Sequence, residues 1–134
     1  MEIETALRNY LLAQNSITTT AGVGQRIYFE HADQSVAKPY IVIERTSDPG
    51  EHTSDGPVAM GSQSVIIGCY GTTWTSARDV AAAVKAALDG LTGIIGGAGG
   101  LTLNPVFYEN QDSGYDADVG LYYVDQEYLC QVEG

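Results

Sequence analysis

The stretch QSVIIGCYGTTWTSARDVAAAVKAALDGLTG, residues Gln63 to Gly93, decides the fold. It predicts a strand, a tight turn and an alanine-rich helix in direct succession. Ile66 and Tyr70 make the second face of the strand apolar, which is typical of a strand that is covered on both sides or meets a partner. The first face carries the alternating residues Val65, Ile67 and Cys69. None of this is a catalytic or phosphate-binding motif, so the stretch favours an architectural role.

The helix in this stretch has recognisable ends. Ser76 and Asp79 have the spacing of a capping box, which predicts the helix start. Gly90 and Gly93 are predicted C-caps, because glycine adopts the left-handed conformation at low cost. The predicted buried stripe consists of Ala77, Val80, Ala81, Val84, Leu88 and Leu91.

The rest of the chain adds a second helix and several strands. Residues 2–13 show the apolar spacing of an amphipathic helix, and a Thr-rich loop is predicted after it. Period-two patterns predict strands at 26–31, 40–46, 101–109 and 121–132. We therefore predict an α+β fold, with a mostly antiparallel sheet that carries both helices on one face. The 134 residues fit a single domain, 1–134.

Two polar segments, 47–62 and 110–120, are predicted to be long loops, which are often functional. Segment 47–62 is either a hairpin tip or an arm that orders against a neighbouring subunit. The candidate assembly residues in the two segments are Asp48, Pro49, Glu51, His52, Asp55, Pro57, Met60, Asp112, Tyr115, Asp116 and Asp118.

The sequence contains only incomplete matches to metal-binding and cofactor-binding motifs. The glycine run at 96–100 lacks the Gly-Lys-Ser/Thr of a phosphate loop, so a turn is predicted there. Asp112, Asp116, Asp118 and Glu127 allow a calcium hypothesis, but Gly120 and Leu121 fall where a calcium loop needs other residues. We expect no metal and no cofactor.

The formal net charge is −11, from 6 basic and 17 acidic residues. Such a surface repels phosphate backbones and argues against tight nucleic-acid binding. It is compatible with a wall past which DNA slides, and equally with a merely acidic surface.

The two cysteines and two histidines do not indicate a reactive site. Cys69 and Cys130 lie in strand patterns and are expected to be buried free thiols; a disulfide would need matched register and an oxidising compartment. His31 and His52 lie in or beside polar loops, and no G-x-S-x-G motif is present. We expect no enzymatic activity. The acidic N-terminus does not resemble a signal peptide, and no membrane span is expected.

Five features of the sequence occur together in a fixed order. They are the N-terminal helix with Leu7 and Leu11 and the segments GQRIY (24–28), PYIVIERTS (39–47), VIIGCYGTTWTSARDVAAAVKAALDG (65–90) and LYYVDQEYLCQV (121–132), which is the closing strand. In these features, over nearly its whole length, the chain resembles the tail completion, or tail terminator, proteins of long-tailed phages.

The resemblance implies a virion protein that is assembled in the host cytoplasm. It would form a homo-hexameric ring that caps the tail tube, joins it to the head-side connector or stopper protein, and leaves a lumen for DNA. An alternative is another neck or tail-tube subunit. An alternative of a different class is a small acidic calcium- or ligand-binding domain.

Overall fold

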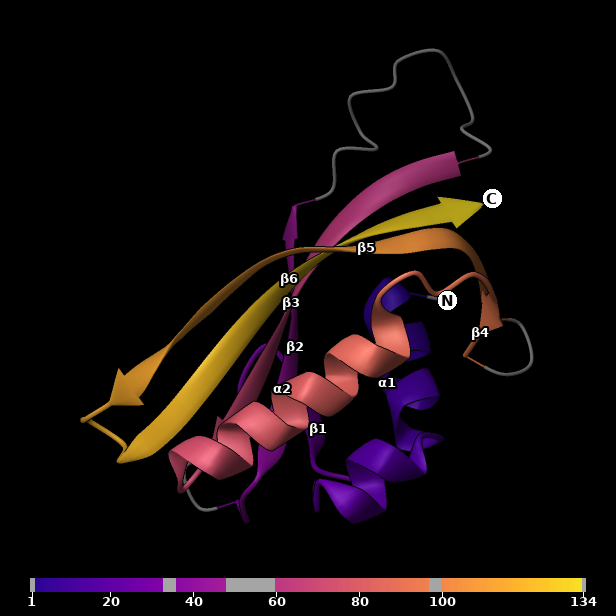
Figure 1. The fold of residues 1–134 in the computed structure, drawn as a ribbon. Helices are drawn as coiled ribbons and strands as arrows, with labels where there is room; N and C mark the ends of the chain where they lie inside the picture. Colours follow the sequence, from indigo (N-terminus) through magenta and orange to yellow (C-terminus); the bar gives the residue numbers. More distant parts are fainter. Residues whose placement is uncertain (1, 33–35, 48–59, 97–99, 134) are drawn as a thin grey trace.

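The computed structural model describes residues 2–32, 36–47, 60–96 and 100–133. Long strands run diagonally through the molecule, and α2 runs in roughly the same direction beside them (Figure 1). The elements, in chain order, are α1 (Ile3–Leu12), a π-helical turn η1 (Ser16–Thr20), β1 (Ile27–Phe29), β2 (Tyr40–Ser47), β3 (Met60–Gly71), α2 (Trp74–Leu88), β4 (Gly93–Ile95), β5 (Leu101–Asp116) and β6 (Leu121–Glu133).

The strands form one six-stranded sheet in the order β1-β2-β3-β6-β5-β4. The sheet is mostly antiparallel, as the sequence predicts, but it is mixed because one edge pair is parallel. The pairs β2–β3, β3–β6, β5–β6 and β4–β5 are antiparallel. The edge strand β1 runs parallel to β2, with Ile27 opposite Ile41. Parallel neighbours cannot be joined by a tight hairpin, so the chain between Phe29 and Tyr40 must travel back along the sheet.

The prediction of a loop over residues 110–120 is wrong for residues 110–116. These residues extend β5 and pair with β6, from Asn110 opposite Glu127 to Asp116 opposite Leu121. Only 117–120 form a turn, in which the Gly120 N–H donates to the Asp116 carbonyl at 2.8 Å. The polar side chains of this stretch are exposed, which explains why they lack the apolar alternation of a half-buried strand.

The loop predicted over 47–62 is shorter than expected as well. β3 already begins at Met60, which lies opposite Glu133 of β6. Residues 48–59 lie outside the described residues.

The start of α2 differs from the predicted capping box at Ser76 and Asp79. The N-cap is Thr73, whose hydroxyl accepts a hydrogen bond from the Ser76 N–H at 3.1 Å. Gly90 follows the helix in the left-handed conformation expected of a C-cap, with φ 80°. Gly93, the second predicted cap, instead opens β4.

The core lies between the helices and one face of the sheet. Side chains of α1 and α2 share one buried cluster with alternating residues of β2, β3, β5 and β6. The helical members are Ile3, Ala6, Leu7, Leu11, Ala77, Val80, Ala81, Val84 and Leu88; the strand members include Ile41, Ile43, Val65, Ile67, Cys69, Leu103, Val106, Val124, Tyr128 and Cys130.

Both cysteines are free and buried, as predicted. Cys69 lies opposite Val124, and Cys130 lies opposite Gln63, so the two thiols occupy distant positions along neighbouring strands. Burial raises the pKa of Cys130 to about 12, and it raises the pKa of Cys69 further. Neither thiol is a nucleophile at neutral pH, because the thiolate is the reactive form.

A buried glutamine interrupts the apolar face of β6. Gln126 is 1% exposed, and its amide donates to the Ala81 carbonyl of α2 at 3.0 Å and to Gln111 at 3.2 Å. The Tyr128 hydroxyl donates to the Gln126 amide oxygen at 2.8 Å. Since buried polar groups are costly without partners, this network joins α2 to the sheet in a defined position.

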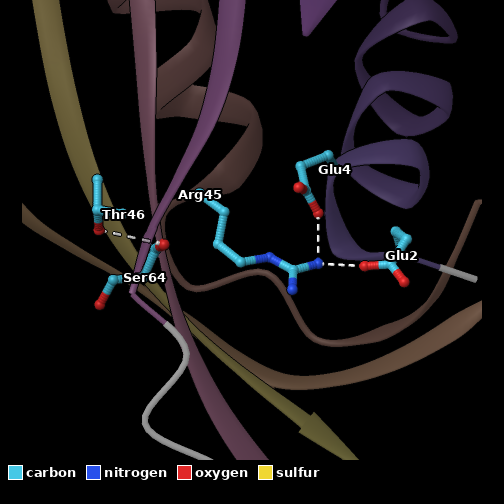
Figure 2. A network of polar contacts seen from close by, with 5 residues as sticks. All are labelled: Glu2, Glu4, Arg45, Thr46 and Ser64. Carbon is cyan, nitrogen blue, oxygen red and sulfur yellow. Dashed lines mark hydrogen bonds and ion pairs between the residues drawn. The ribbon is translucent and has the colours of Figure 1, made fainter. Parts of the chain in front are cut away.

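An ion-pair network joins α1 to β2 (Figure 2). The guanidinium of Arg45 contacts the carboxylates of both Glu2 and Glu4, the latter at 2.7 Å. The Glu4 side chain is 19% exposed, whereas that of Glu2 is 72% exposed. Solvent screens exposed pairs strongly, so the Glu4 contact carries most of the stabilisation.

Substitution of the buried glutamine should be costly. Gln126→Ala removes the partner of Tyr128 and leaves a void, so we expect a loss of about 2 to 3 kcal/mol in the free energy of unfolding, measured in urea. The control Gln111→Ala, at an exposed position of the same network, should cost less than about 1 kcal/mol. Equal losses would contradict this role of Gln126.

The two acidic partners of Arg45 should contribute unequally. Glu4→Gln should lower the free energy of unfolding by about 1 kcal/mol, and Glu2→Gln by about 0.3 kcal/mol or less, because only the Glu4 pair is shielded from solvent. Thermal unfolding of both variants measures the difference. A loss at Glu2 as large as that at Glu4 would show that burial does not set the strength of this network.

Candidate assembly surfaces

The sheet has a second face, which points away from the core. It carries a small separate cluster of the buried residues Tyr40, Val42 and Leu121, with Tyr28, Ala32, Val36 and Tyr70 packed against it. Side chains of this face alternate with the core residues along the same strands. We call this surface the open face.

A row of tyrosines crosses the open face from β1 to β6. The Tyr40 and Tyr70 rings are stacked, with centroids 5.0 Å apart and planes 12° apart. Tyr28 meets Tyr40 edge-on at 6.1 Å, and Tyr123 lies 6.4 Å from Tyr70. Tyrosine contributes contact area at low entropic cost and is enriched in protein interfaces. The row is therefore a candidate contact surface.

A cavity of about 310 Å³ opens beside this row. The polypeptide after β1 forms one wall, the turn between β5 and β6 contributes the rim, and strands β2, β3 and β6 form the floor. The lining residues are Glu30, His31, Ala32, Lys38, Tyr40, Val42, Glu44, Ile66, Gly68, Tyr70, Asp116, Val119, Leu121 and Asp125.

Gly68 keeps the floor of the cavity open. A Cβ atom at this position would lie 2.9 Å from the Tyr70 ring and 3.0 Å from an Asp125 carboxylate oxygen. Any larger residue would displace one of these two side chains. The absence of a side chain at Gly68 thus leaves room for the Tyr70 ring and the Asp125 carboxylate.

The carboxylates of the cavity repel one another. Burial raises the pKa of Asp125, and the negative charges of Asp112 and Glu44 raise it further. An acid whose pKa rises on folding stabilises the fold while it is protonated, and this stabilisation is lost as the pH rises through the raised pKa. Ionisation of Asp125 therefore opposes folding, and a cation close to its carboxylate would relieve this cost.

Tyr40 and Tyr70 of the row remain protonated at neutral pH. Burial and the Asp125 charge raise the pKa of Tyr70 to about 12. Burial and the Asp116 charge raise the pKa of Tyr40 as well. Both phenols can therefore donate a hydrogen bond, while the carboxylates of the same cavity accept one.

The candidate residues of the second predicted loop lie on the hairpin of β5 and β6. Asp112, Tyr115 and Asp116 lie on β5, Asp118 lies in the turn, and all four are exposed. Tyr115 packs against Tyr122 with ring centroids 4.7 Å apart. Among the described residues, β4 pairs only with the first part of β5, so the outer edge of this hairpin has no neighbouring strand.

Most candidate assembly residues of the first predicted loop are not described by the structure. Asp48, Pro49, Glu51, His52, Asp55 and Pro57 lie outside the described residues. Met60 begins β3, at the end of the sheet opposite the β5–β6 turn. Met60 and the β5–β6 turn therefore lie at opposite ends of one sheet.

Asp116 and Glu127 of the calcium hypothesis are kept apart by the strand register. Asp116 lies opposite Leu121, whereas Glu127 lies opposite Asn110 further along the sheet. Within the described ranges, no group of three or more His, Cys, Asp or Glu residues is arranged to hold a metal ion. In the same part of the chain, no helix has the length and apolar character needed to cross a membrane.

An aromatic and cationic patch lies at the start of α2, on the helix side of the sheet. Trp74 is 57% exposed, and the Arg78 guanidinium lies 5.0 Å from the centre of its indole ring. Further along the helix, Lys85 lies 4.2 Å above the Tyr108 ring. Trp and Arg are the residue types most enriched at energetic centres of interfaces.

The sequence reasoning missed the cavity and the Trp74–Arg78 patch. One feature of the sequence does point to the cavity. Tyr40 and Tyr70 alternate with core residues along their strands, which predicts that both tyrosines lie on the face away from the core. The cavity itself depends on strand order and on the parallel β1, which no local pattern encodes. The four-residue spacing of Trp74 and Arg78 predicts a helical pair, but only with the helix start at Thr73.

The chain was compared with known proteins. The family model described as tail completion protein gp17 matches residues 5–133. A chain in the solved virion of a native gene transfer agent particle matches with a TM-score of 0.75 and 18% sequence identity, covering 98% of this chain and 95% of the other. At this identity the structural match shows a shared fold. No curated protein matches the chain.

The predicted resemblance is therefore confirmed at the level of the family. The family match extends from α1 to the last residues of β6, so it includes every element described above. The chain belongs to the tail completion protein gp17 family.

Proposed function

We propose that this protein forms a ring of identical subunits, six by resemblance to its family, that caps the phage tail tube and joins it to the head-side connector. The family match over residues 5–133 is the observation that carries this proposal. The full-length fold match to a chain of a virion particle supports a place in the virion. Assembly would take place in the host cytoplasm.

Acidic surfaces suit the lumen of such a ring. With a net charge of −11, the subunit repels the DNA backbone, and DNA could pass without being held. We further propose that the protein has no catalytic role. The acidic groups of the open face then serve to contact other proteins and not to catalyse a reaction.

The two ends of the sheet offer different surfaces for different partners. At one end, β2 finishes at Ser47 and β3 begins at Met60, on either side of segment 48–59. At the other end lies the exposed β5–β6 turn. In a ring whose strands run along the rotation axis, these ends form two unlike rims. We assign one rim to the tail tube and the other to the connector.

Capping of the tail tube is directly testable. Purified protein added to polymerising tail-tube protein should bind tube ends as a ring and limit tube length, as seen by negative-stain microscopy. Mass photometry of the protein alone should show a ring mass. Binding along the tube wall would favour another neck or tail-tube subunit, and a persistent monomer that ignores tubes would refute the proposal.

The arm hypothesis for segment 47–62 needs its own variant. Replacing residues 49–58 with a Gly-Ser linker of about six residues leaves both strands intact and is long enough to join them. We expect a folded protein with an unchanged circular dichroism spectrum and at least tenfold weaker assembly or tube binding. Unaltered ring formation and capping would remove the arm from the interface.

A further inference from the structure

We infer that neighbouring subunits contact one another through the Trp74–Arg78 patch of one copy and the open-face cavity of the next. The inference rests on the proposed ring and names its interface. The occupant of the cavity is thus a second copy of this chain. Its indole ring would enter the cavity, and its guanidinium would meet the carboxylates Glu44 and Asp125.

The chemistry of the two surfaces is complementary. The patch offers an exposed indole and a cation. The cavity offers stacked tyrosine rings and carboxylates that repel one another. An arriving guanidinium would neutralise this repulsion, and the indole N–H, which can only donate, would meet carboxylate acceptors.

The size of the cavity agrees with this occupant. Its 310 Å³ lies at the lower end of the volumes of ligand pockets, roughly 300 to 1,000 Å³. Such a space accepts one large side chain rather than a folded peptide segment. Tyr40, Val42 and Tyr70 line this cavity, so an aromatic ring that enters it would meet aromatic and aliphatic side chains.

The positions of the two surfaces suit a cyclic ring. A head-to-tail interface needs two different patches on one subunit. The patch lies on the helix side and the cavity on the open face, so the helices of one subunit would pack on the sheet of the next. Both lie at the same end of the sheet, since Tyr70 of the cavity and Trp74 are separated by one short turn. Subunits related by rotation alone place such surfaces at one height along the ring axis.

The scarcity of positive charge strengthens the assignment. Of the six basic residues in the chain, Arg8, Arg26 and Arg45 bond to their own subunit, and Lys38 lines the cavity itself. Arg78 and Lys85 of α2 are the remaining two. A net charge of −11 opposes association of the copies, so a contact that brings opposite charges together is favoured. Arg78 offers such a charge beside the exposed indole.

Trp74 gives a direct optical test, because it is the one tryptophan of the chain. Its fluorescence in the assembled wild-type ring should shift to shorter wavelength, and acrylamide quenching should fall severalfold relative to the dilute monomer. A ring in which Trp74 stays as accessible as in the monomer would overturn the inference while leaving the proposed ring intact.

Charge reversal tests the pairing of the two surfaces. Arg78→Glu and Glu44→Arg each change an exposed side chain, and each should weaken ring formation at least tenfold in sedimentation velocity. A mixture of the two variants should restore rings that contain both in equal number, since every interface in an alternating ring then joins opposite charges. Lys85→Glu, with the same charge change two turns along α2, is the matched control and should assemble normally.

Neutral variants separate assembly from folding. Trp74→Ala should assemble poorly with an unchanged melting temperature, because the indole is exposed in the subunit. Asp125→Asn should keep or raise the melting temperature while it weakens assembly. If the wild-type protein, Trp74→Ala and Arg78→Glu all form normal rings, the proposed interface is refuted while the proposed ring is not. A wild-type protein that never forms rings would refute both the interface and the proposed function.

Discussion

The structure depends on the burial of one face of β3 and β6 against α2. Val65, Ile67, Val124 and Tyr128 are at most 1% exposed, and the small residues Ala77 and Ala81 let the helix approach the strands closely. Because side chains alternate across a strand, full burial of one face commits the other to point outward. The open face thus follows directly from the core, and its tyrosines and carboxylates are the surface that this subunit presents.

The central strand–turn–helix could be predicted from the sequence because its signals are local. The alternation of Val65, Ile67 and Cys69 and the stripe of α2 both match the observed burial. The extension of β5 to Asp116 could not be seen in its own residues, since an exposed hairpin needs no apolar side chains. Its evidence is the pairing with β6, from Asn110 opposite Glu127 to Asp116 opposite Leu121, which only the tertiary structure shows. The parallel pairing of β1 was equally hidden, because strand direction is set by tertiary contacts between segments.

The candidate sites also differ in whether local sequence or tertiary structure determines them. Exposed residues of the hairpin could be chosen from composition, and Asp112, Tyr115, Asp116 and Asp118 are indeed on the surface. The cavity could not, because it joins residues that are distant in the sequence, from Glu30 after β1 to Asp125 of β6. Similarity of fold does not replace this information, since a structural neighbour with 18% identity shows a shared fold and not the side chains of a contact. The contact chemistry must be found in this chain.

Charge then limits how such a subunit can assemble. An acidic surface keeps copies apart at long range, so association has to come from short-range packing at a place where charge is locally balanced. A cavity whose carboxylates already repel one another stores a small unfavourable energy in the free subunit. A contact that brings a cation there gains both its own attraction and the release of that repulsion. Exposed surface pairs lack the second gain, and for this reason a recessed acidic pocket makes a more selective contact than the acidic rim around it.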